Sequence, residues 1–383
     1  MKADPLPAIG SGGADCPQPH RGEATLERIF VRRAWYAVGW AEDLAPGQLL
    51  PATVMNEVIV LYRDTAGGIV ALEDRCCHRA APLSIGRIEG DALRCMYHGL
   101  KFGPDGRCIE IPGQERIPPQ TRVRGYAAVE WKGWLWVWMD SPETADPSLL
   151  PPVDAPDDPA WIFRRGHIDY RAHYMLINDN LLDFSHLSYV HEKTFGDTNL
   201  FATTRPRIER MPRCLRIMRW LRDVPRPATS LSAGAGRTDR WLSYDFHVPG
   251  TLILSSATYE AGTADRLNSE APPEDLPFIE ASRSCQVITP LTDGTSRYYF
   301  TNGPSILTGS AAQADHAFRI TLAAFDEDKA MIEAQSRTLL IDPYVKMVPV
   351  AADAALSQYR WMMKKLMEQE AAETTPAQDG AAA

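Results

Sequence analysis

The chain has 383 residues, more than one ordinary domain of about 100–200 residues, and 45% of them are hydrophobic, so we expect two folded domains without extensive disorder. The formal net charge is −9, from 40 Lys and Arg against 49 Asp and Glu, which argues against nucleic acid as a partner. No apolar run reaches the ~18–20 residues of a membrane span, and the start lacks the apolar stretch of a secretory signal, so we expect a cytoplasmic protein with no membrane partner.

Residues 26–145 predict an all-β domain, because short apolar runs alternate with turn residues and no long helical pattern interrupts them. The clearest expected strands are residues 54–62, residues 69–74 and the aromatic run 126–139. A proline-rich and acidic stretch, residues 141–159, follows these strands and predicts a linker between two domains.

Residues 146–370 predict a second domain that mixes strands with helices, so the whole chain is expected to have an α+β fold. The expected strands lie in residues 161–170 and 241–300. The expected helices, which carry apolar residues at helical spacing, are residues 177–190, 312–340 and 352–370. The composition of both ends, residues 1–25 and 371–383, predicts flexible tails.

Two cysteine–histidine pairs, Cys76-x-His78 and Cys95-x-x-His98, lie close together in the first domain. The odd total of seven cysteines and the missing secretory signal argue against a disulfide framework and favour a metal site. In structural zinc sites with two Cys and two His, the cysteines come from one arm and the histidines from the other. Here each arm supplies one of each, which favours a [2Fe–2S] cluster with two thiolates on one iron and two imidazoles on the other.

A second group of candidate ligands follows in the second domain, with the spacing Asn180-x-x-Asp183-x-x-His186-x-x-x-x-His191. Two histidines and one carboxylate are the ligands of non-haem Fe(II) sites that leave positions open for O2. On a regular helix the two histidines would differ by roughly 140° in direction and could not share a metal ion. We therefore expect a π-type widening of the helix or a break near Ser188.

Together these motifs resemble those of the Rieske non-haem iron oxygenases, and the resemblance runs from Trp35-Tyr36 to the last helices. Respiratory Rieske proteins carry a disulfide where this chain has Ala81 and Tyr97, and Leu100 favours the demethylase branch. The chain is most similar to the oxygenase (alpha) component of the vanillate and dicamba O-demethylase type. This resemblance implies a Rieske β domain, then a helix-grip (START-like) antiparallel sheet with helices, and a head-to-tail homotrimer.

The same resemblance implies roles for individual residues. The two cysteine–histidine pairs would hold the [2Fe–2S] cluster, and His186 and His191 would hold a mononuclear iron. The third iron ligand would be Asp328, with Asp326 and Glu327 as competing positions whose other role is to favour a helix N-terminus. As catalytic residues, Asp183 would link the two metal centres across a subunit boundary and Asn180 would lie beside the iron.

The implied function is that of the terminal oxygenase component of a multicomponent monooxygenase in aromatic compound catabolism. Electrons from NADH would arrive through an NAD(P)H-dependent ferredoxin reductase and a ferredoxin, because the chain has no G-x-G-x-x-G nucleotide fingerprint. O2 would be the co-substrate, and oxidation of a methoxy or N-alkyl group would give O- or N-dealkylation. A ring-dihydroxylating dioxygenase and a side-chain hydroxylase remain alternatives, because they use the same metal motifs.

Two more distant alternatives are a zinc-stapled ligand-binding protein and an electron-transfer protein that carries only the cluster. The latter would need only about 100 residues and would lack the second motif.

A local charge excess supports a protein partner for electron transfer. Between Arg75 and Arg107 there are six basic residues and three acidic ones, a net of +3 that favours an acidic electron carrier.

The substrate pocket is expected to be mostly apolar and to bind an aromatic small molecule. Its candidate lining residues are Ile177, Leu181, Phe184, Leu187, His247, Leu252 and Tyr298. Arg297 would favour a carboxylated substrate if it faced the pocket, but strand neighbours alternate between faces, so an anionic and a neutral substrate both remain open. Cys77 and Cys108 are expected to be buried thiols.

Overall fold

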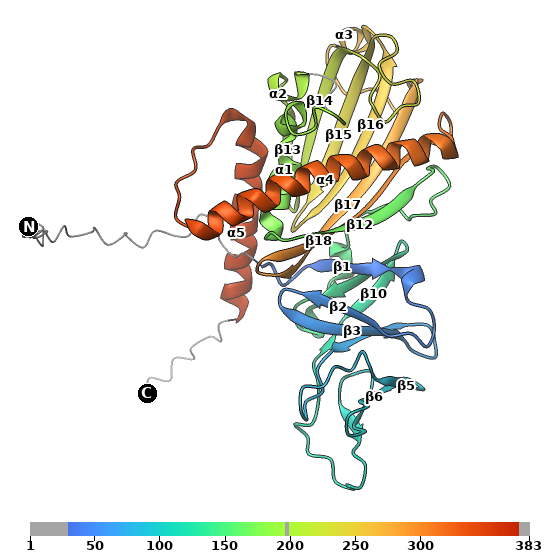
Figure 1. The fold of residues 1–383 in the computed structure, drawn as a ribbon, viewed down its shortest axis with the longest axis vertical. Helices are drawn as coiled ribbons and strands as arrows, with labels where there is room; N and C mark the ends of the chain where they lie inside the picture. Colours follow the sequence, from blue (N-terminus) through green and yellow to red (C-terminus); the bar gives the residue numbers. More distant parts are fainter. Residues whose placement is uncertain (1–29, 196–198, 375–383) are drawn as a thin grey trace, which may run out of the picture.

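The computed structural model describes residues 30–195 and 199–374 of the chain. The predicted tail 1–25 and residues 375–383 of the second predicted tail lie outside this description. Figure 1 shows the N-terminal half, coloured blue to cyan, below the C-terminal half, with β1 and β18 near the junction. None of the helices in the described ranges combines the length and the apolar character that a bilayer crossing requires.

The N-terminal half is all-β, as predicted, and consists of one three-stranded and two four-stranded sheets. The sheets are formed by β1 (Trp35–Trp40), β11 (Trp134–Trp138) and β10 (Ala128–Trp131); by β2 (Leu50–Val54), β3 (Glu57–Arg63), β4 (Ile69–Glu73) and β9 (Gly125–Tyr126); and by β5 (Arg87–Glu89), β6 (Ala92–Arg94), β7 (Lys101–Phe102) and β8 (Cys108–Glu110).

The prediction of one strand over residues 54–62 was wrong, because a hairpin turn interrupts it. Val54 pairs with Glu57, and the two residues between them, Met55 and Asn56, have φ values of 51° and 65°. A two-residue turn with both residues in the left-handed region matches the right-handed twist of the flanking strands. Asparagine tolerates the left-handed region better than most residues, so Asn56 was the sequence feature that could have indicated this turn.

The C-terminal half is built on a seven-stranded antiparallel sheet, which agrees with the expected α+β fold. In spatial order its strands are β12 (Arg164–Tyr170), β18 (Thr295–Pro304), β17 (Glu280–Thr292), β16 (Thr251–Glu260), β15 (Thr238–His247), β14 (Cys214–Val224) and β13 (Arg207–Met211). Neither β13 nor β14 was predicted from the sequence.

Helices cover one face of this sheet, and the long α4 crosses it diagonally in Figure 1. The helices on this face are α1 (Tyr174–Leu182), α2 (Leu200–Thr203), α4 (Ala311–Ile341) and α5 (Ala354–Thr374), whereas the short α3 (Thr263–Arg266) packs against Trp220 and Tyr259. Buried residues of α4 recur every three or four positions, including Ala314, Ala317 and Thr321, so one stripe of the helix faces the strands. Because α5 continues to Thr374, residues 371–374 belong to a helix and not to the predicted tail.

The predicted linker, residues 141–159, is held against both halves by specific hydrogen bonds. The indole N–H of Trp35 donates to the carbonyl of Asp146 at 2.8 Å, and that of Trp134 donates to the carbonyl of Asp154 at 3.2 Å. The Asp154 carboxylate also accepts a hydrogen bond from Arg283 on β17. The linker therefore fastens the N-terminal strands to the large sheet.

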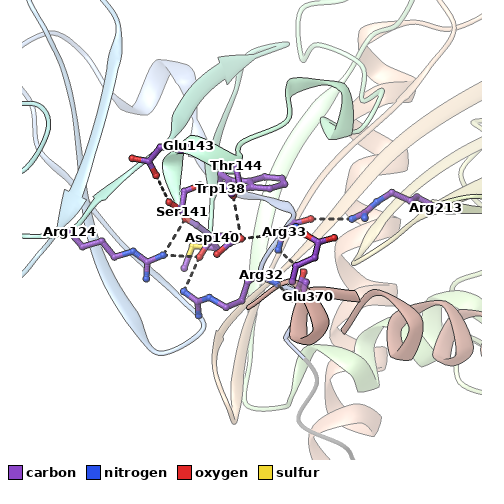
Figure 2. A network of polar contacts seen from close by, with 12 residues as sticks. Arg32, Arg33, Arg124, Trp138, Asp140, Ser141, Glu143, Thr144, Arg213 and Glu370 are labelled. Atoms are coloured by element: carbon purple, nitrogen blue, oxygen red, sulfur yellow. Dashed lines mark hydrogen bonds and ion pairs between the residues drawn. The ribbon is translucent and has the colours of Figure 1, made fainter. Parts of the chain in front are cut away.

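A second attachment joins the start of the described chain to the last helix (Figure 2). The carboxylate of Glu370 on α5 accepts the backbone N–H of Arg32 at 3.0 Å and that of Arg33 at 2.7 Å. The Arg33 side chain donates to Asp140 at 2.9 Å, and Arg213 donates to the Arg33 carbonyl at 3.3 Å. Residues distant in sequence thus converge where the two halves meet.

Replacing Glu370 with Ala should lower the free energy of unfolding by about 2 kcal/mol, because two hydrogen bonds to a charged acceptor are lost. The measurement is the urea midpoint at unchanged m-value. Glu368→Ala is the matched control, because Glu368 lies on the same helix and pairs with the exposed Lys365. Equal midpoints for the two variants would show that Glu370 does not fasten the halves together.

Candidate metal centres and the cavity beside them

The four predicted cluster ligands lie on two short loops of the N-terminal half that have the same hydrogen-bonding pattern. The backbone N–H of Cys76 donates to the carbonyl of Ala81 at 2.8 Å, and the N–H of Cys95 donates to the carbonyl of Leu100 at 2.8 Å. Each loop therefore closes on the residue five positions after its cysteine. The repeated closure explains how two separated sequence motifs adopt matching conformations.

Each loop also contains a left-handed residue four positions after its cysteine. This residue is Gly99 in the second loop, with φ of 78°, and Ala80 in the first, with φ of 56°. Its N–H donates back to the carbonyl of Cys95 or Cys76, respectively. Glycine adopts this conformation without strain, whereas alanine does so at a cost of about 1–2 kcal/mol.

The loops bring two thiols and two imidazoles together. Cys76 and Cys95 are buried, whereas His78 is exposed and its ring centroid lies 4.6 Å from that of His98. Burial, together with the neighbouring Cys95, raises the pKa of Cys76 to about 11. This donor set, with thiols inside and imidazoles toward the surface, fits a [2Fe–2S] cluster with mixed ligands.

The two remaining cysteines of this region differ in exposure. Cys108 is buried, as expected, but Cys77 is exposed, so the expectation of a buried Cys77 was wrong. Cys77 is the next residue after the buried Cys76, and its side chain is exposed to solvent.

The second candidate centre begins where α1 ends, and the predicted continuous helix over residues 177–190 was wrong. The backbone turns extended at Asp183, with φ of −123° and ψ of 94°, and a 3-10 helix (Phe184–Ser188) follows. The Asp183 carboxylate caps this helix by accepting the N–H of Ser185 at 2.8 Å. His186 lies in the 3-10 helix and His191 lies in the turn beyond Ser188, so the expected break near Ser188 does end a helix.

The two histidines meet Asp328 of α4 in the interior. The Asp328 Oδ1 atom is 3.5 Å from Nε2 of His186 and 3.2 Å from Nε2 of His191. One potential ligand atom from each residue lies within 4.8 Å of the others. Asn180 donates to the same Oδ1 at 2.9 Å. Of the three acidic candidates on α4, Asp328 is the one beside both histidines, and Asp326 is exposed.

Hydrogen bonds fix how the two imidazoles face Asp328. Nδ1 of His186 contacts the carbonyl of Asp183, and Nδ1 of His191 lies 2.9 Å from Oε2 of Glu327. An Nδ1–H donor at each ring leaves Nε2 as the free metal-binding nitrogen. Glu327 was expected to be a competing ligand or to favour a helix N-terminus, but it lies inside α4, and its orienting contact with His191 was not predicted.

The surroundings shift the pKa values of His186 and His191 in opposite directions. Burial lowers the pKa of His186. Burial also acts to lower the pKa of His191, but Asp328 and Glu327 outweigh it and raise this pKa overall. Two imidazole nitrogens and one carboxylate fit the donor set of a non-haem Fe(II) site, and metal binding requires both Nε2 atoms to be unprotonated.

Glu327→Ala should weaken iron binding by about 10–100-fold, because His191 loses the acceptor that orients it. Competition with a chelator under anaerobic conditions measures this affinity. Asp326→Ala is the matched control, because Asp326 is exposed on the same helix turn. Unchanged iron affinity in Glu327→Ala would remove the orienting role.

A cavity of about 160 Å³ adjoins His186, His191 and Asp328. Of the predicted pocket residues, Leu181, Phe184 and Leu187 line it. An aromatic and aliphatic wall thus lies directly beside the candidate metal centre.

The other predicted pocket residues do not line this cavity. His247 and Arg297 lie on the opposite face of the sheet, where Cys214 lies beside His247 and Asp169 pairs with Arg297. Ile177 is buried in the core on α1. Leu252 and Tyr298 are also buried in the core without reaching the cavity.

Sequence reasoning missed the polar part of the cavity wall. The missed lining residues include Arg240, Glu280, Ser284, Gln286, Asn302 and Thr321. They come from strands and from α4, and only the strand register and the helix position bring them together.

Two known protein families match this chain, one in each half. The family described as "Rieske [2Fe-2S] domain" matches residues 34–126, and the family described as "Vanillate O-demethylase oxygenase C-terminal domain" matches residues 170–369. The second match alone covers more than half of the chain.

Relatives resemble the chain over almost its whole length. The iron–sulfur subunit of the toluene-4-sulfonate monooxygenase system of Comamonas testosteroni is 40% identical over 353 residues, covering 91% of this chain and 100% of the relative. The vanillate O-demethylase oxygenase subunit of Pseudomonas sp. (strain HR199 / DSM 7063) is 31% identical, covering 90% and 98%. Dicamba monooxygenase bound to 3,6-dichlorosalicylic acid has the same fold, with a TM-score of 0.79 and 26% identity over 90% of this chain and 99% of that one.

Proposed function

Because the chain belongs to the family of Rieske oxygenase components with a vanillate O-demethylase type catalytic domain, we propose that it hydroxylates a methyl, methoxy or N-alkyl carbon of an aromatic compound. It is the terminal oxygenase component of a multicomponent monooxygenase, an oxidoreductase that uses O2, a Rieske [2Fe–2S] cluster and mononuclear iron. Hydroxylation of a methoxy or N-methyl carbon releases formaldehyde, whereas hydroxylation of a ring methyl carbon leaves an alcohol.

The observation that carries this proposal is the position of the cavity. Its apolar residues Leu181, Phe184 and Leu187 adjoin the group of His186, His191 and Asp328. An aromatic ring packed on this wall would place a substituent carbon near the metal centre. Relatives described as a toluene-4-sulfonate monooxygenase, a vanillate O-demethylase and a chloroacetanilide N-alkylformylase support oxidation at a substituent over oxidation of the ring.

We assign the cluster to Cys76, His78, Cys95 and His98, and the mononuclear iron to His186, His191 and Asp328. When bound, the cluster supplies single electrons and the iron supplies the site of O2 activation. The chain's own residues orient and shield these groups. Burial of Cys76, Cys95 and Asp328 keeps water away from the donor atoms, and Asn180 fixes the Asp328 carboxylate.

We further propose that electrons cross between subunits of a homotrimer and that Asp183 is the connection. His78 is exposed, and the neighbouring Met96 and Tyr97 expose 54% and 60% of their surfaces. Such an apolar rim around an imidazole edge is suited to burial against another protein surface. Asp183 is half-buried and its backbone carbonyl contacts His186, so a donor from a neighbouring subunit could reach the iron side through it.

A ferredoxin and an NAD(P)H-dependent ferredoxin reductase would deliver the electrons, because oxygenase components of this family depend on such partners. The dependence on NADH supports action in the cytoplasm. Basic residues near the cluster, such as the exposed Arg75, Arg79 and Arg107, would attract an acidic electron carrier.

Product analysis with a reconstituted reductase and ferredoxin tests the proposal. Formaldehyde from methoxy- and N-methyl-substituted aromatics, or an alcohol from ring-methyl compounds, is the expected result. A cis-diol as the main product would overturn it in favour of ring dihydroxylation. A colourless protein that contains zinc and no acid-labile sulfide would overturn the assignment of the cluster ligands as well.

A further inference from the structure

A separate group of potential metal ligands lies on the face of the large sheet opposite the cavity, which we call the outer face. Cys214 is the first residue of β14 and His247 is the last residue of β15, and the two are paired directly across these strands. Asp245 lies two residues before His247 on β15, so its side chain is on the same face. The end of this strand pair therefore carries a thiol, an imidazole and a carboxylate side by side.

The distances within this group fit one shared ion. Sγ of Cys214 lies 3.8 Å from Nε2 of His247, and one ligand atom from each of Cys214, Asp245 and His247 lies within 4.8 Å of the others. Zinc binds thiolate sulfur at about 2.3 Å and imidazole nitrogen at about 2.0–2.1 Å, so two such ligands on a tetrahedral ion are about 3.5 Å apart. The observed separation of Cys214 and His247 is close to this value.

Arg216 fixes the direction of the Asp245 carboxylate. Nε of Arg216 donates to Oδ1 and a terminal nitrogen donates to Oδ2, both at 2.7 Å. A carboxylate has about four lone-pair positions, so this contact leaves others for a metal ion, and carboxylates that bind metals are themselves hydrogen-bonded in this way. A thiolate and a carboxylate bring two negative charges and Arg216 brings one positive charge, so the group remains negative and favours a cation.

The three side chains differ in their access to solvent. Cys214 is buried, whereas Asp245 and His247 are half-buried. Burial raises the pKa of the Cys214 thiol to about 12, so a metal ion must replace its proton, and binding releases that proton to solvent. The partial exposure of Asp245 and His247 provides an entry path for the ion and a position for a water molecule as the fourth ligand.

The donor set is typical of zinc. Thiolate ligands select Zn²⁺, Cu⁺ or iron–sulfur clusters, imidazole suits Zn²⁺ as well, and carboxylate with water alone would suit Mg²⁺ or Ca²⁺. Three protein ligands with a water molecule in the fourth position is an arrangement that zinc adopts. The group of His186, His191 and Asp328 contains no sulfur, so its donors differ from those of the outer face.

We propose that Cys214, Asp245 and His247 form a zinc site on the outer face of the sheet, separate from both iron centres. This site goes beyond the proposed function, because the oxidation of a substrate in the cavity does not use it. A bound Zn²⁺ ties the first residue of β14 to the last residue of β15. Arg213, which precedes Cys214, donates to the carbonyl of Arg33, so the ion stabilises the sheet where the two halves of the molecule meet.

Metal analysis of the iron-loaded holoenzyme tests the proposal. The protein is incubated anaerobically with one equivalent of Zn²⁺, desalted and analysed for zinc and iron by mass spectrometry. We expect about one zinc per chain to be retained without loss of iron, because the ligands of the two metals lie on opposite faces of the sheet. Failure to retain zinc would overturn the proposal and leave a thiol–imidazole hydrogen bond as the role of Cys214 and His247.

X-ray absorption at the zinc edge identifies the ligands of the retained ion. We expect one sulfur at about 2.3 Å together with nitrogen and oxygen at about 2.0–2.2 Å. Zinc that has replaced the mononuclear iron would have no sulfur ligand, and zinc in the two loops of the cluster ligands would have two. Either of these two spectra would overturn the proposal.

Two variants connect the bound zinc with individual residues. Cys214→Ser and His247→Ala should each lower the zinc affinity at least about tenfold, because loss of a residue that only orients a ligand already costs 10–100-fold. Competition with a fluorescent chelator measures this affinity. Iron content and the visible spectrum of the cluster show that each variant has folded.

Cys285→Ser is the matched control. Cys285 is a buried cysteine in register with Asp245 through Ile253 on the same face of the sheet, and its Sγ lies 3.4 Å from Oδ2 of Asp154. Cys285 does not belong to the group of converging ligand atoms, so this variant should keep wild-type zinc affinity. Unchanged affinity in both Cys214→Ser and His247→Ala, or an equal loss in Cys285→Ser, would overturn the proposal.

Discussion

Asp183→Asn should reduce turnover by about 100-fold or more, equivalent to about 2.7 kcal/mol, while both metal centres stay loaded. The Asp183 carboxylate accepts the N–H and the hydroxyl of Ser185 at 2.8 and 2.9 Å. Asparagine is an equally good capping residue, so the 3-10 helix and the position of His186 should persist. What changes is the negative charge that would receive a hydrogen bond from the neighbouring subunit's cluster histidine.

Steady-state oxygen consumption and product formation measure this effect, with iron and sulfide analysis of the same preparation. Asp169→Asn is the matched control, because Asp169 forms an ion pair with Arg297 on the outer face of the sheet. The control should keep wild-type turnover. Normal turnover in Asp183→Asn would exclude Asp183 as the connection between the centres, and loss of iron would mean that its role is structural.

His186→Ala should remove the mononuclear iron and leave the visible spectrum of the cluster intact. His186 provides one of the three converging ligand atoms, and its loss leaves His191 and Asp328 as an incomplete set. The proposed cluster ligands lie on loops of the other half, so the acid-labile sulfide content of the protein should not change. Activity should fall below detection, because the open coordination positions for O2 disappear with the iron.

Metal analysis of anaerobically reconstituted protein, combined with visible spectroscopy, measures both centres. His247→Ala is the matched control, because His247 lies on the opposite face of the sheet beside Cys214. That variant should keep its full iron content. Bleaching of the visible spectrum in His186→Ala would show that the ligands of the two centres have been misassigned.

The N-terminal candidate site could be predicted from sequence because it is local. Cys76 and His78 share one loop, as do Cys95 and His98, and each loop closes within six residues. Short spacing fixes such geometry almost independently of the rest of the fold. The exposure of Cys77 escaped prediction, because the direction of a side chain beside a buried neighbour depends on the turn and not on composition.

The second site could be predicted only in part, because its geometry depends on contacts between distant segments. The spacing of His186 and His191 indicated a break in the helix but did not reveal that the break lies at Asp183, where the backbone is extended. Glu327 and Asp328 are adjacent in sequence, and a helix turns by about 100° between them. Which of the two faces His186 therefore depends on how α4 lies across the sheet.

The cavity was the least predictable feature, because it depends on strand register. A shift of one residue exchanges the two faces of a strand, so the sequence alone could not place His247 outside the cavity or Gln286 inside it. The strands β13 and β14 were missed for a related reason. In β14 the arginines Arg216, Arg219 and Arg222 interrupt the apolar residues, and the strand carries buried side chains on both faces.

The Glu370 contact with Arg32 and Arg33 has a consequence for biosynthesis. The N-terminal half emerges from the ribosome first, and domains generally fold in that order at synthesis rates of about 5–20 residues per second. The carboxylate that fastens this half comes from α5, near the end of translation. The Glu370 contacts therefore form only after translation has reached α5, later than the contacts of the first half with β17 through Asp154 and Ala37.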